Sequence, residues 1–397
     1  MDSFRRAQGA FAILFIVILV IASTLNFAAQ LPLFRGKLDQ LPENSGLNKV
    51  IGAIDHVANG SILEQEFLVH SHSLLQVLLG KEESGGFEIV KSGHGELDYG
   101  NFYPILTLQT EEYALRMRLL RDYLSGKGSE VVFINAMDLY DRGYSSYSSG
   151  LPVNDQNAIS DALLYYLQSY GVDFLDSRQI LKASSLQPEQ YRYNTDIHWT
   201  VEAGFEVFTA VIKKLSDEYD LNLDPDFYYT NPDNYKHTLY PQSYVGALGR
   251  RAGIPFSGTD DFLFIEPDFP TQFTMEYTRG NMAYTVTGDF NEALINQSYW
   301  DNGYLYASYL GGVTSWKRIT NRQSQTGPRF LFICDSYAMP VISFLAPMAS
   351  EIHVICPSAD QPLDLEQYVL EHEFDFVFVE YYPGNITEQG FDFFTIL

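Results

Sequence analysis

The sequence predicts an α/β fold in which helices cover both faces of a parallel β-sheet, a three-layer α/β/α arrangement. Segments typical of buried strands alternate with amphipathic helical segments over residues 110–175. The alternation returns over residues 329–380, where three strands and two helices follow one another, as parallel strands with crossover helices do. Residues 221–328 interrupt this rhythm with many Asn, Asp, Gly and Tyr residues, which predicts a β-rich insertion.

Each element of the first half follows from apolar spacing and a boundary residue. The first helical pattern stops at Gly80, and Gly171 is a C-cap for a later helix. Thr200 caps a helix whose apolar stripe begins at Val201, with Glu202 in its first turn. The expected elements are a helix over 62–79, a strand over 87–90, a helix over 110–124, a strand over 130–135, a helix over 158–170, a strand over 172–175 and a helix from 201.

The second half contains a hairpin and three closing units. Alternating segments 273–277 and 282–287 flank Arg279-Gly280, a turn signal that predicts a β-hairpin inside the insertion. The closing elements are a strand over 329–334, a helix over 339–346, a strand over 351–356, a helix over 363–371 and a strand over 374–380.

An apolar segment at the N-terminus follows two positive charges. Residues 9–25 contain no charged side chain, and Arg5 and Arg6 precede them. The segment nearly spans a bilayer core, and the positive-inside rule keeps the N-terminus in the cytoplasm. We therefore expect a single-pass cell-membrane protein, held through residues 9–29, with its C-terminal part extracytoplasmic. The expected parts are a cytoplasmic tip and transmembrane signal anchor over 1–29, a stalk over 30–60 and a globular domain over 61–397 that contains the β-rich insertion.

Two other interpretations of this segment stay open. The small residues Ala28 and Ala29 follow the apolar run, so cleavage of a signal peptide would give a secreted protein. A buried core helix is the third interpretation, although the flanking arginines disfavour it.

Charge and cysteine content restrict the class of partner. Lys and Arg total 25 and Asp and Glu total 50, a formal net charge of −25, which is the wrong sign for binding phosphates, so we expect no nucleic acid partner. The only two cysteines, Cys334 and Cys356, exclude a disulfide scaffold and a multi-cysteine zinc module. They end consecutive expected strands, and buried thiols or one disulfide are both open.

Ser336 is the first candidate for chemistry. The expected strand 329–334 runs into Asp335-Ser336 and then into a helix with Pro340 in its first turn. This turn exposes a hydroxyl at the carboxyl edge of the sheet, where open α/β folds bind ligands. Amides at the start of the helix, beginning with that of Tyr337, are candidates for stabilising an oxyanion. The alternative is a purely structural role, in which Ser336 is only a helix N-cap.

Asp196 and His198 supply the other members of a triad. In an extended segment residues two apart point the same way, so the carboxylate can orient the imidazole while His198 takes the serine proton. Trp199 either walls this site or packs beneath it. Two alternatives remain: a surface loop histidine, and a metal-dependent hydrolase that uses the same pair with ligands the sequence does not identify.

The two motifs together resemble the DHHW family, extracytoplasmic proteins similar to the alginate O-acetyltransferases. The resemblance covers roughly residue 61 to the C-terminus and implies a permuted SGNH-hydrolase-like fold. Its blocks are Asn194–Thr200, Gly246–Arg251, Tyr304–Gly312 and Ile333–Pro340. The family roles make Ser336 the nucleophile, His198 the general base and Asp196 its orienting carboxylate. The order Asp, His, Ser is the reverse of ordinary SGNH hydrolases, as the permutation implies.

The sequence departs from the family pattern at two places. The first His of the family motif is Ile197 here, which spares the triad. Val313 follows Gly312 where the family usually has Asn, which puts the second oxyanion-hole donor in doubt. Arg250 is a candidate for binding an anionic substrate group, and a surface ion pair is the alternative.

We therefore expect an enzyme that transfers or hydrolyses acetyl groups on a cell-envelope or exopolysaccharide glycan. The mechanism needs no cofactor, and the resemblance implies a membrane-bound O-acyltransferase that delivers the acetyl group. The alternative from another class is a catalytically inactive polysaccharide-binding or assembly protein that keeps the fold.

Overall fold

The structure is a computed structural model that describes Val17, Thr24 and residues 65–280, 282–359 and 363–393. The chain divides into two compact units, Met1–His72 and Ser73–Leu397. The expected anchor and stalk lie outside the described residues, apart from Val17 and Thr24. In the part that the structure describes, no helix combines the length and the apolar character that a membrane span needs.

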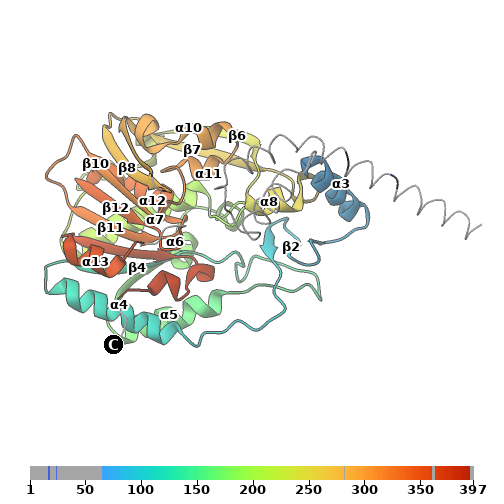
Figure 1. Ribbon diagram of the computed structural model, residues 1–397, viewed down its shortest axis with the longest axis horizontal. Helices are drawn as coiled ribbons and strands as arrows, with labels where there is room; N and C mark the ends of the chain where they lie inside the picture. The colour runs from blue at the N-terminus through green and yellow to red at the C-terminus, as the bar shows by residue number, and fades with distance from the viewer. Residues whose placement is uncertain (1–16, 18–23, 25–64, 281, 360–362, 394–397) are drawn as a thin grey trace, which may run out of the picture. The chain divides into compact units, whose positions relative to one another are not determined.

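An eight-stranded sheet forms the centre of the second unit (Figure 1). In spatial order its strands are β5 (Asp173–Asp176), β4 (Glu130–Asn135), β13 (Phe376–Tyr381), β11 (Arg329–Cys334), β12 (Glu351–Ile355), β10 (Trp316–Asn321), β8 (Phe273–Arg279) and β9 (Met282–Gly288). The pairs from β5 to β12 are parallel, and β10, β8 and β9 continue the sheet in antiparallel pairing. The predicted mixed α/β fold with a large, mostly parallel sheet is confirmed.

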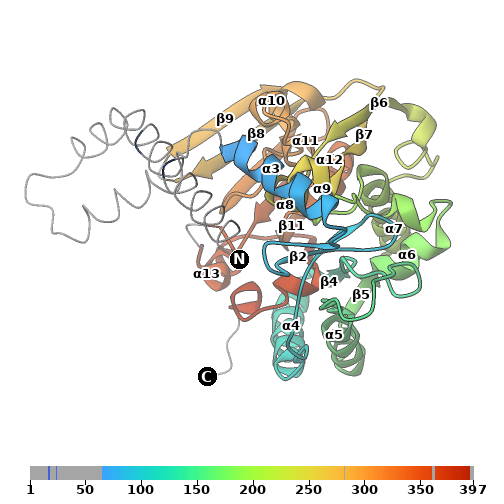
Figure 2. The same ribbon diagram turned by 90° about the vertical axis from the view of Figure 1, so that its right-hand side faces the viewer.

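Helices cover the two faces of this sheet, as Figures 1 and 2 show. Successive strand residues point to opposite faces. Val132 and Ile134 therefore pack in one core with α7 and α12, while Val131 and Phe133 pack in another with α4, α5 and α13. The helices are α4 (Thr110–Ser125), α5 (Asn157–Ser169), α6 (Ser177–Ala183), α7 (Val201–Tyr219), α12 (Ala338–Leu345) and α13 (Leu365–Glu371).

Smaller elements surround this core, and several of them come from the expected insertion. Strands β8, β9 and β10 of residues 221–328 extend the main sheet, so this region is part of the same compact unit. The remaining strands are β1 (Glu83–Ser84), β2 (Ile89–Lys91) and β3 (Leu97–Tyr99) in one small sheet and β6 (Tyr235–Tyr244) and β7 (Asp260–Pro267) in another.

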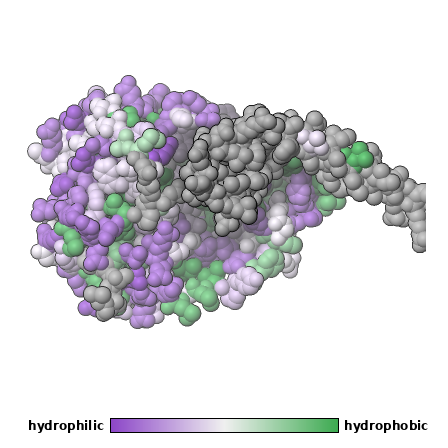
Figure 3. Space-filling model, in the orientation of Figure 1, coloured by the Kyte–Doolittle hydropathy of each residue, from purple (hydrophilic) through white to green (hydrophobic). Residues whose placement is uncertain are grey.

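The remaining helical segments are short, except for α3. They are α3 (Gln65–Leu78), α8 (Ala247–Ala252), α9 (Ile254–Ser257), α10 (Gln297–Asp301), α11 (Leu305–Ser308), the 3₁₀ turns η1 (Pro188–Gln190), η2 (Pro232–Asn234), η4 (Ala346–Met348), η5 (Pro383–Asn385) and η6 (Gln389–Phe391), and the π-helical turn η3 (Phe290–Leu294). The surface in Figure 3 is mostly hydrophilic, in keeping with the excess of acidic residues.

Candidate active site

His198 contacts both other members of the predicted triad. Its Nε2 lies 2.7 Å from Ser336 Oγ, and its Nδ1 lies 3.0 Å from Asp196 Oδ2. The His198 side chain is 13% exposed and that of Asp196 is 3% exposed, while Ser336 is partly buried. This is the arrangement in which a histidine removes the hydroxyl proton and a carboxylate holds the histidine.

Ser336 stands in the turn between β11 and α12, and a buried carboxylate shapes that turn. Asp335 accepts hydrogen bonds from the backbone N–H groups of Tyr337 and Tyr382, both at 2.9 Å, and from Asn385 Nδ2 at 3.0 Å. Tyr382 follows β13, the parallel neighbour of β11. The aspartate therefore ties the serine turn to the carboxyl end of the adjacent strand.

Asp196 is held by donors on both carboxylate oxygens. Its Oδ1 accepts from the N–H groups of Ile197 at 2.8 Å and Ala247, at the start of α8, at 3.1 Å, and its Oδ2 also accepts from the Tyr244 hydroxyl. Burial alone raises the pKa of Asp196, but His198 and the hydrogen bonds from Tyr244 and Ala247 outweigh burial and hold that pKa well below its ordinary value. Asp196 therefore stays ionised and stabilises a protonated imidazole.

Two buried charged side chains position the segment that carries Asp196 and His198. Asp260 accepts from the N–H groups of Asn194 and Thr195, at 2.9 and 2.8 Å, and from the Thr195 hydroxyl at 2.6 Å. Arg192 donates to the backbone carbonyls of Leu139 at 2.7 Å and Asp196 at 3.3 Å. Polar contacts from distant parts of the chain thus fix a segment that is neither helix nor strand.

The glycines of the block 246–251 are required by close packing on this segment. A Cβ on Gly246 would lie 2.2 Å from Asp196 Cβ, and a Cβ on Gly249 would lie 2.8 Å from Thr195 Cβ. The N–H of Gly249 donates to the Thr195 carbonyl at 2.8 Å. Only residues without a side chain allow α8 to approach closely enough for the Ala247 amide to reach Asp196.

Aromatic rings enclose the histidine. The Tyr306 ring stacks on His198 with a centroid distance of 4.1 Å, and its hydroxyl donates to the Tyr337 carbonyl at 3.1 Å. The Tyr337 hydroxyl donates to the Ile197 carbonyl. Trp199 is fully buried and meets the Tyr337 ring edge to face at 5.2 Å, so it packs beneath the site and does not wall it.

The Tyr337 amide, expected to stabilise an oxyanion, and the amide of the candidate Gly312 both have hydrogen-bond partners within the protein. The Tyr337 N–H donates to Asp335 Oδ1, because Asp335 forms a tight turn with the residue two positions later. The Gly312 N–H donates to the Tyr309 carbonyl at 3.3 Å inside a turn where Gly311 and Gly312 have φ of +67° and +68°. Within the described residues, the Ser336 N–H donates to no protein acceptor, so it is available as a donor.

The arginine pair has structural contacts. Arg250 donates to the carbonyls of Val245 at 2.9 Å and Gly303 at 2.8 Å, and its guanidinium lies 4.2 Å from the centre of the Tyr304 ring. Arg251 pairs with Glu88. Arg250 thereby connects α8 with the turn before α11.

The structure also bears on the two cysteines and on possible metal ligands. Cys334 and Cys356 are both buried free thiols, so the open question of a disulfide is answered in favour of thiols. Within the described residues, no group of three or more His, Cys, Asp or Glu side chains is arranged for metal binding.

Sequence reasoning missed Tyr244, Tyr306, Arg192 and Asp260 as supports of the site. Tyr306 lies inside the block 304–312 that the resemblance singled out, and Tyr244 stands two residues before Gly246, so both blocks held a signal. Asp260 had none, because its partners Asn194 and Thr195 lie about 65 residues away in sequence. Arg192 had none, because its partners are backbone carbonyls, which leave no pattern in the sequence of side chains.

Fold and site together define an α/β protein with an Asp-His-Ser arrangement at the carboxyl edge of a parallel sheet. No protein-family model matches the sequence, and no curated protein matches it. Several solved structures share the fold. Bacillus cereus PatB1 superposes with a TM-score of 0.63 at 15% identity, over 76% of this chain and 98% of that chain.

A second PatB1 structure, with a sulfonyl adduct, gives a TM-score of 0.60 at 14% identity, over 76% of this chain and 96% of that chain. A DHHW family protein from Eubacterium siraeum gives 0.57 at 15% identity, over 77% of this chain and 94% of that chain. At these identities the likeness concerns the fold, and at that level the expected resemblance to the DHHW family is confirmed.

Proposed function

We propose that this protein is a serine acyltransferase or esterase of permuted SGNH-like fold that acts on O-acetyl groups of an extracytoplasmic glycan. The observation that carries the proposal is the pair of contacts from His198, 2.7 Å to Ser336 and 3.0 Å to Asp196. The fold shared with PatB1, one structure of which bears a sulfonyl adduct, supports it. The apolar residues 9–25 after Arg5 and Arg6 support placement outside the cytoplasm.

The chemistry proceeds in two half-reactions. Ser336 Oγ attacks the acyl carbonyl carbon while His198 Nε2 takes the hydroxyl proton and Asp196 stabilises the imidazolium. The Ser336 N–H is the backbone donor placed to stabilise the oxyanion. The intermediate then expels the donor alcohol, which receives the proton from His198, and leaves an acetyl-serine ester.

The second half-reaction decides between transfer and hydrolysis. A sugar hydroxyl attacks the acetyl-serine ester, His198 takes its proton, and Ser336 leaves as the free hydroxyl when the proton returns. Water in place of the sugar makes the enzyme an esterase. A membrane-bound O-acyltransferase partner would supply the acetyl donor on the outer side of the membrane.

A second candidate is a polysaccharide-binding or assembly protein without activity. The observation that favours it is the engagement of the Tyr337 and Gly312 amides, which leaves fewer donors for an oxyanion.

One assay separates the two candidates. The full-length protein in detergent is incubated with 4-nitrophenyl acetate, alongside Ser336→Ala, His198→Ala and Asp196→Asn. The enzyme proposal requires turnover that falls by about 10³-fold or more in the serine and histidine variants. The exposed residues Ser298 and His237 provide matched controls, Ser298→Ala and His237→Ala. Equal turnover in wild type and triad variants contradicts the proposal.

A further inference from the structure

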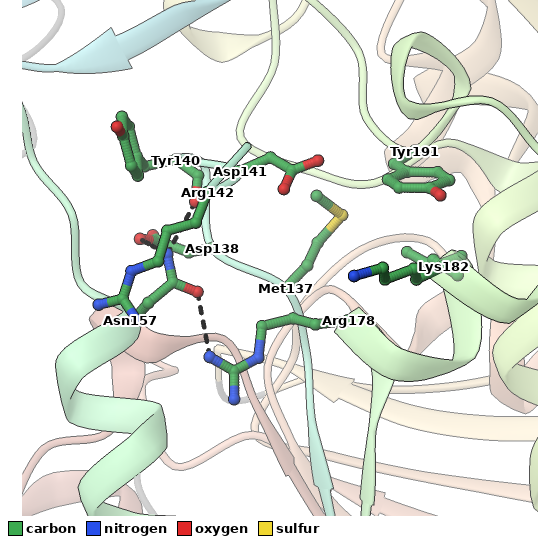
Figure 4. A pocket seen from close by; sticks show the side chains of 10 residues that line it. Met137, Asp138, Tyr140, Asp141, Arg142, Asn157, Arg178, Lys182 and Tyr191 are labelled. Atoms are coloured by element: carbon green, nitrogen blue, oxygen red, sulfur yellow. Dashed lines mark hydrogen bonds between the residues drawn. The ribbon is translucent and has the colours of Figure 1, made fainter. Parts of the chain in front are cut away.

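A pocket of about 200 Å³ lies beyond the carboxyl ends of β4 and β5. It is formed by the segment that follows β4, by α6 and by Tyr191, and Figure 4 shows these side chains. Its lining includes Met137, Tyr140, Asp141, Lys182 and Tyr191. None of them belongs to the triad.

The pocket is nevertheless connected to the triad. The buried Arg192 donates both to the carbonyl of Leu139, in the segment that follows β4, and to the carbonyl of Asp196. In the sheet only β13 separates β4 from β11, which leads to Ser336. Two strand spacings amount to about 10 Å. The pocket therefore lies at the same carboxyl edge of the sheet as Ser336, two to three strands away from the strand that leads to the serine.

One set of polar side chains builds the wall of the pocket. Arg142 and Arg178 both pair with Asp161 at 2.7 Å, and Arg178 also donates to Asn157 Oδ1 at 3.1 Å. Asn157 Nδ2 donates to the Tyr140 carbonyl at 2.8 Å. These side chains use most of their hydrogen-bonding capacity on one another. They therefore hold the shape of the pocket and have few donors or acceptors left for a ligand.

A second set is available for a ligand. Figure 4 shows the Asp141 carboxylate and the Lys182 ammonium turned toward the same space, with the Tyr191 ring beside it and the Tyr140 ring farther off, beyond Asp141. In the described part of the chain, neither charged group has a recorded hydrogen bond or ion pair through its side chain. Met137 is buried and adds an apolar surface. The pocket thus offers one acceptor group, one donor group, aromatic faces and an apolar patch.

We propose that this pocket binds one neutral or N-acetylated sugar unit of the acceptor glycan, at a distance along the glycan from the unit that is acylated. This inference rests on the proposed function. Sugar hydroxyls both donate and accept, which suits Asp141 and Lys182, and the C–H face of a pyranose packs on a tyrosine ring. The volume is below the 300–1,000 Å³ of sites for drug-sized ligands, which suits a single unit. An anionic sugar is disfavoured because both arginines are already paired.

The test measures acceptor use by the full-length protein with 4-nitrophenyl acetate as donor. Cellotetraose and chitotetraose are the neutral acceptors, and tetragalacturonate is the anionic one. We expect the KM for the acceptor to rise about tenfold in Tyr191→Ala, Asp141→Asn and Lys182→Met, because each variant loses one hydrogen bond or ring contact to the sugar. The ratio of transfer to hydrolysis should fall by the same factor. The exposed Tyr165 on α5 provides the matched control, Tyr165→Ala. Unchanged acceptor KM in all three variants overturns the inference, and so does a preference for tetragalacturonate.

A binding measurement separates this inference from the proposed function. Calorimetric titration of Ser336→Ala with chitotetraose and cellotetraose is repeated with Tyr191→Ala or Lys182→Met added. Binding that weakens about tenfold in the double variants supports the pocket even if the wild type hydrolyses no ester. If hydrolysis depends on Ser336 but the double variants bind the sugars as Ser336→Ala does, the proposed sugar site is wrong. The proposal that the protein is an enzyme is then unaffected.

Discussion

The hydroxyl of Tyr244 donates a hydrogen bond to the Asp196 carboxylate oxygen that faces His198. Tyr244 is the last residue of β6 and is 4% exposed, so this contact is made away from water. The shared oxygen is therefore fixed from two sides, by the imidazole and by the phenol. Tyr244 is a positioning residue, because it acts on the substrate through Asp196 and His198.

Replacing Tyr244 with Phe removes that hydrogen bond and keeps the ring. We expect kcat/KM for 4-nitrophenyl acetate to fall about tenfold, since hydrogen bonds to charged groups contribute about 1.5–3 kcal/mol. The pKa of Asp196 should rise, because the Tyr244 hydroxyl is one of the donors that hold it low, and the acid limb of the pH profile should move to higher pH with it. Tyr165→Phe, on an exposed ring, should behave as wild type. A lower rate with an unshifted pH profile would indicate a structural role instead.

A sulfonyl fluoride should label Ser336. In phenylmethanesulfonyl fluoride, the Ser336 oxygen displaces fluoride from sulfur while His198 takes the proton, which forms a stable sulfonate ester. Peptide mass spectrometry should locate the adduct on Ser336, and activity should be lost in proportion. Ser336→Ala should remain unlabelled, and labelling of His198→Ala should be much slower. Labelling that persists without Ser336, or that falls on another serine such as Ser298, would argue against an activated Ser336.

Adding a methyl group at Gly246 should disable the site. The new Cβ would lie 2.2 Å from Asp196 Cβ, so α8 or the Asp196 segment must move. A displacement near 1 Å at a catalytic group costs about 10²-fold in rate, and we expect a loss of that order for Gly246→Ala. In Gly93→Ala the nearest atom to the new Cβ is 3.4 Å away, which is ordinary contact, so that variant is the control. Equal activity of the two variants would mean that the packing of α8 on Asp196 is not required.

Glu202 should make stability depend on pH. Burial raises its pKa to about 7 from an ordinary value of 4.5, and within the described residues its Oε2 has no hydrogen-bond partner. Between these pKa values the folded state binds more protons than the unfolded state, so the free energy of unfolding falls as pH rises. Below pH 4.5 Glu202 is protonated in both the folded and the unfolded state. Its burial then no longer lowers the free energy of unfolding.

Glu202→Gln should therefore stabilise the protein at pH 8 by about 1–3 kcal/mol and have little effect at pH 4. Urea denaturation of both proteins at the two pH values measures the difference. The exposed Glu189 provides the control, Glu189→Gln. An equal change in stability at both pH values would exclude the ionisation of Glu202 as its cause.

The elements predicted best are those whose pattern is local. The strand expected over 329–334 is β11 with the same bounds, and the helix that Thr200 was expected to cap is α7, where the Thr200 side chain accepts from the Ala203 N–H at 3.1 Å. The hairpin around Arg279-Gly280 is formed by β8 and β9. Buried strands and capped helices carry their signals within a few residues, so one sequence is sufficient to locate them.

The elements missed are those whose pattern depends on distant partners. Strand β10 joins the main sheet between β12 and β8, and α8 is a short helix that packs on the Asp196 segment. Neither has a long periodic stretch, because its stability comes from neighbours elsewhere in the chain. The acceptors that the Tyr337 amide and Arg250 reach could not be predicted for the same reason: which acceptor a donor reaches depends on the folded backbone around it.

The sequence by itself determined the α/β alternation, the serine after a buried strand and an Asp and His two residues apart in an extended segment. Only the tertiary structure decided that His198 and Ser336, 138 residues apart, meet at 2.7 Å. Local spacing dictates which face a side chain takes, because backbone geometry is periodic. The meeting of two segments depends instead on sheet order, on glycines that permit close approach, and on buried groups such as Arg192 and Asp260. These interactions exist only once the chain has folded.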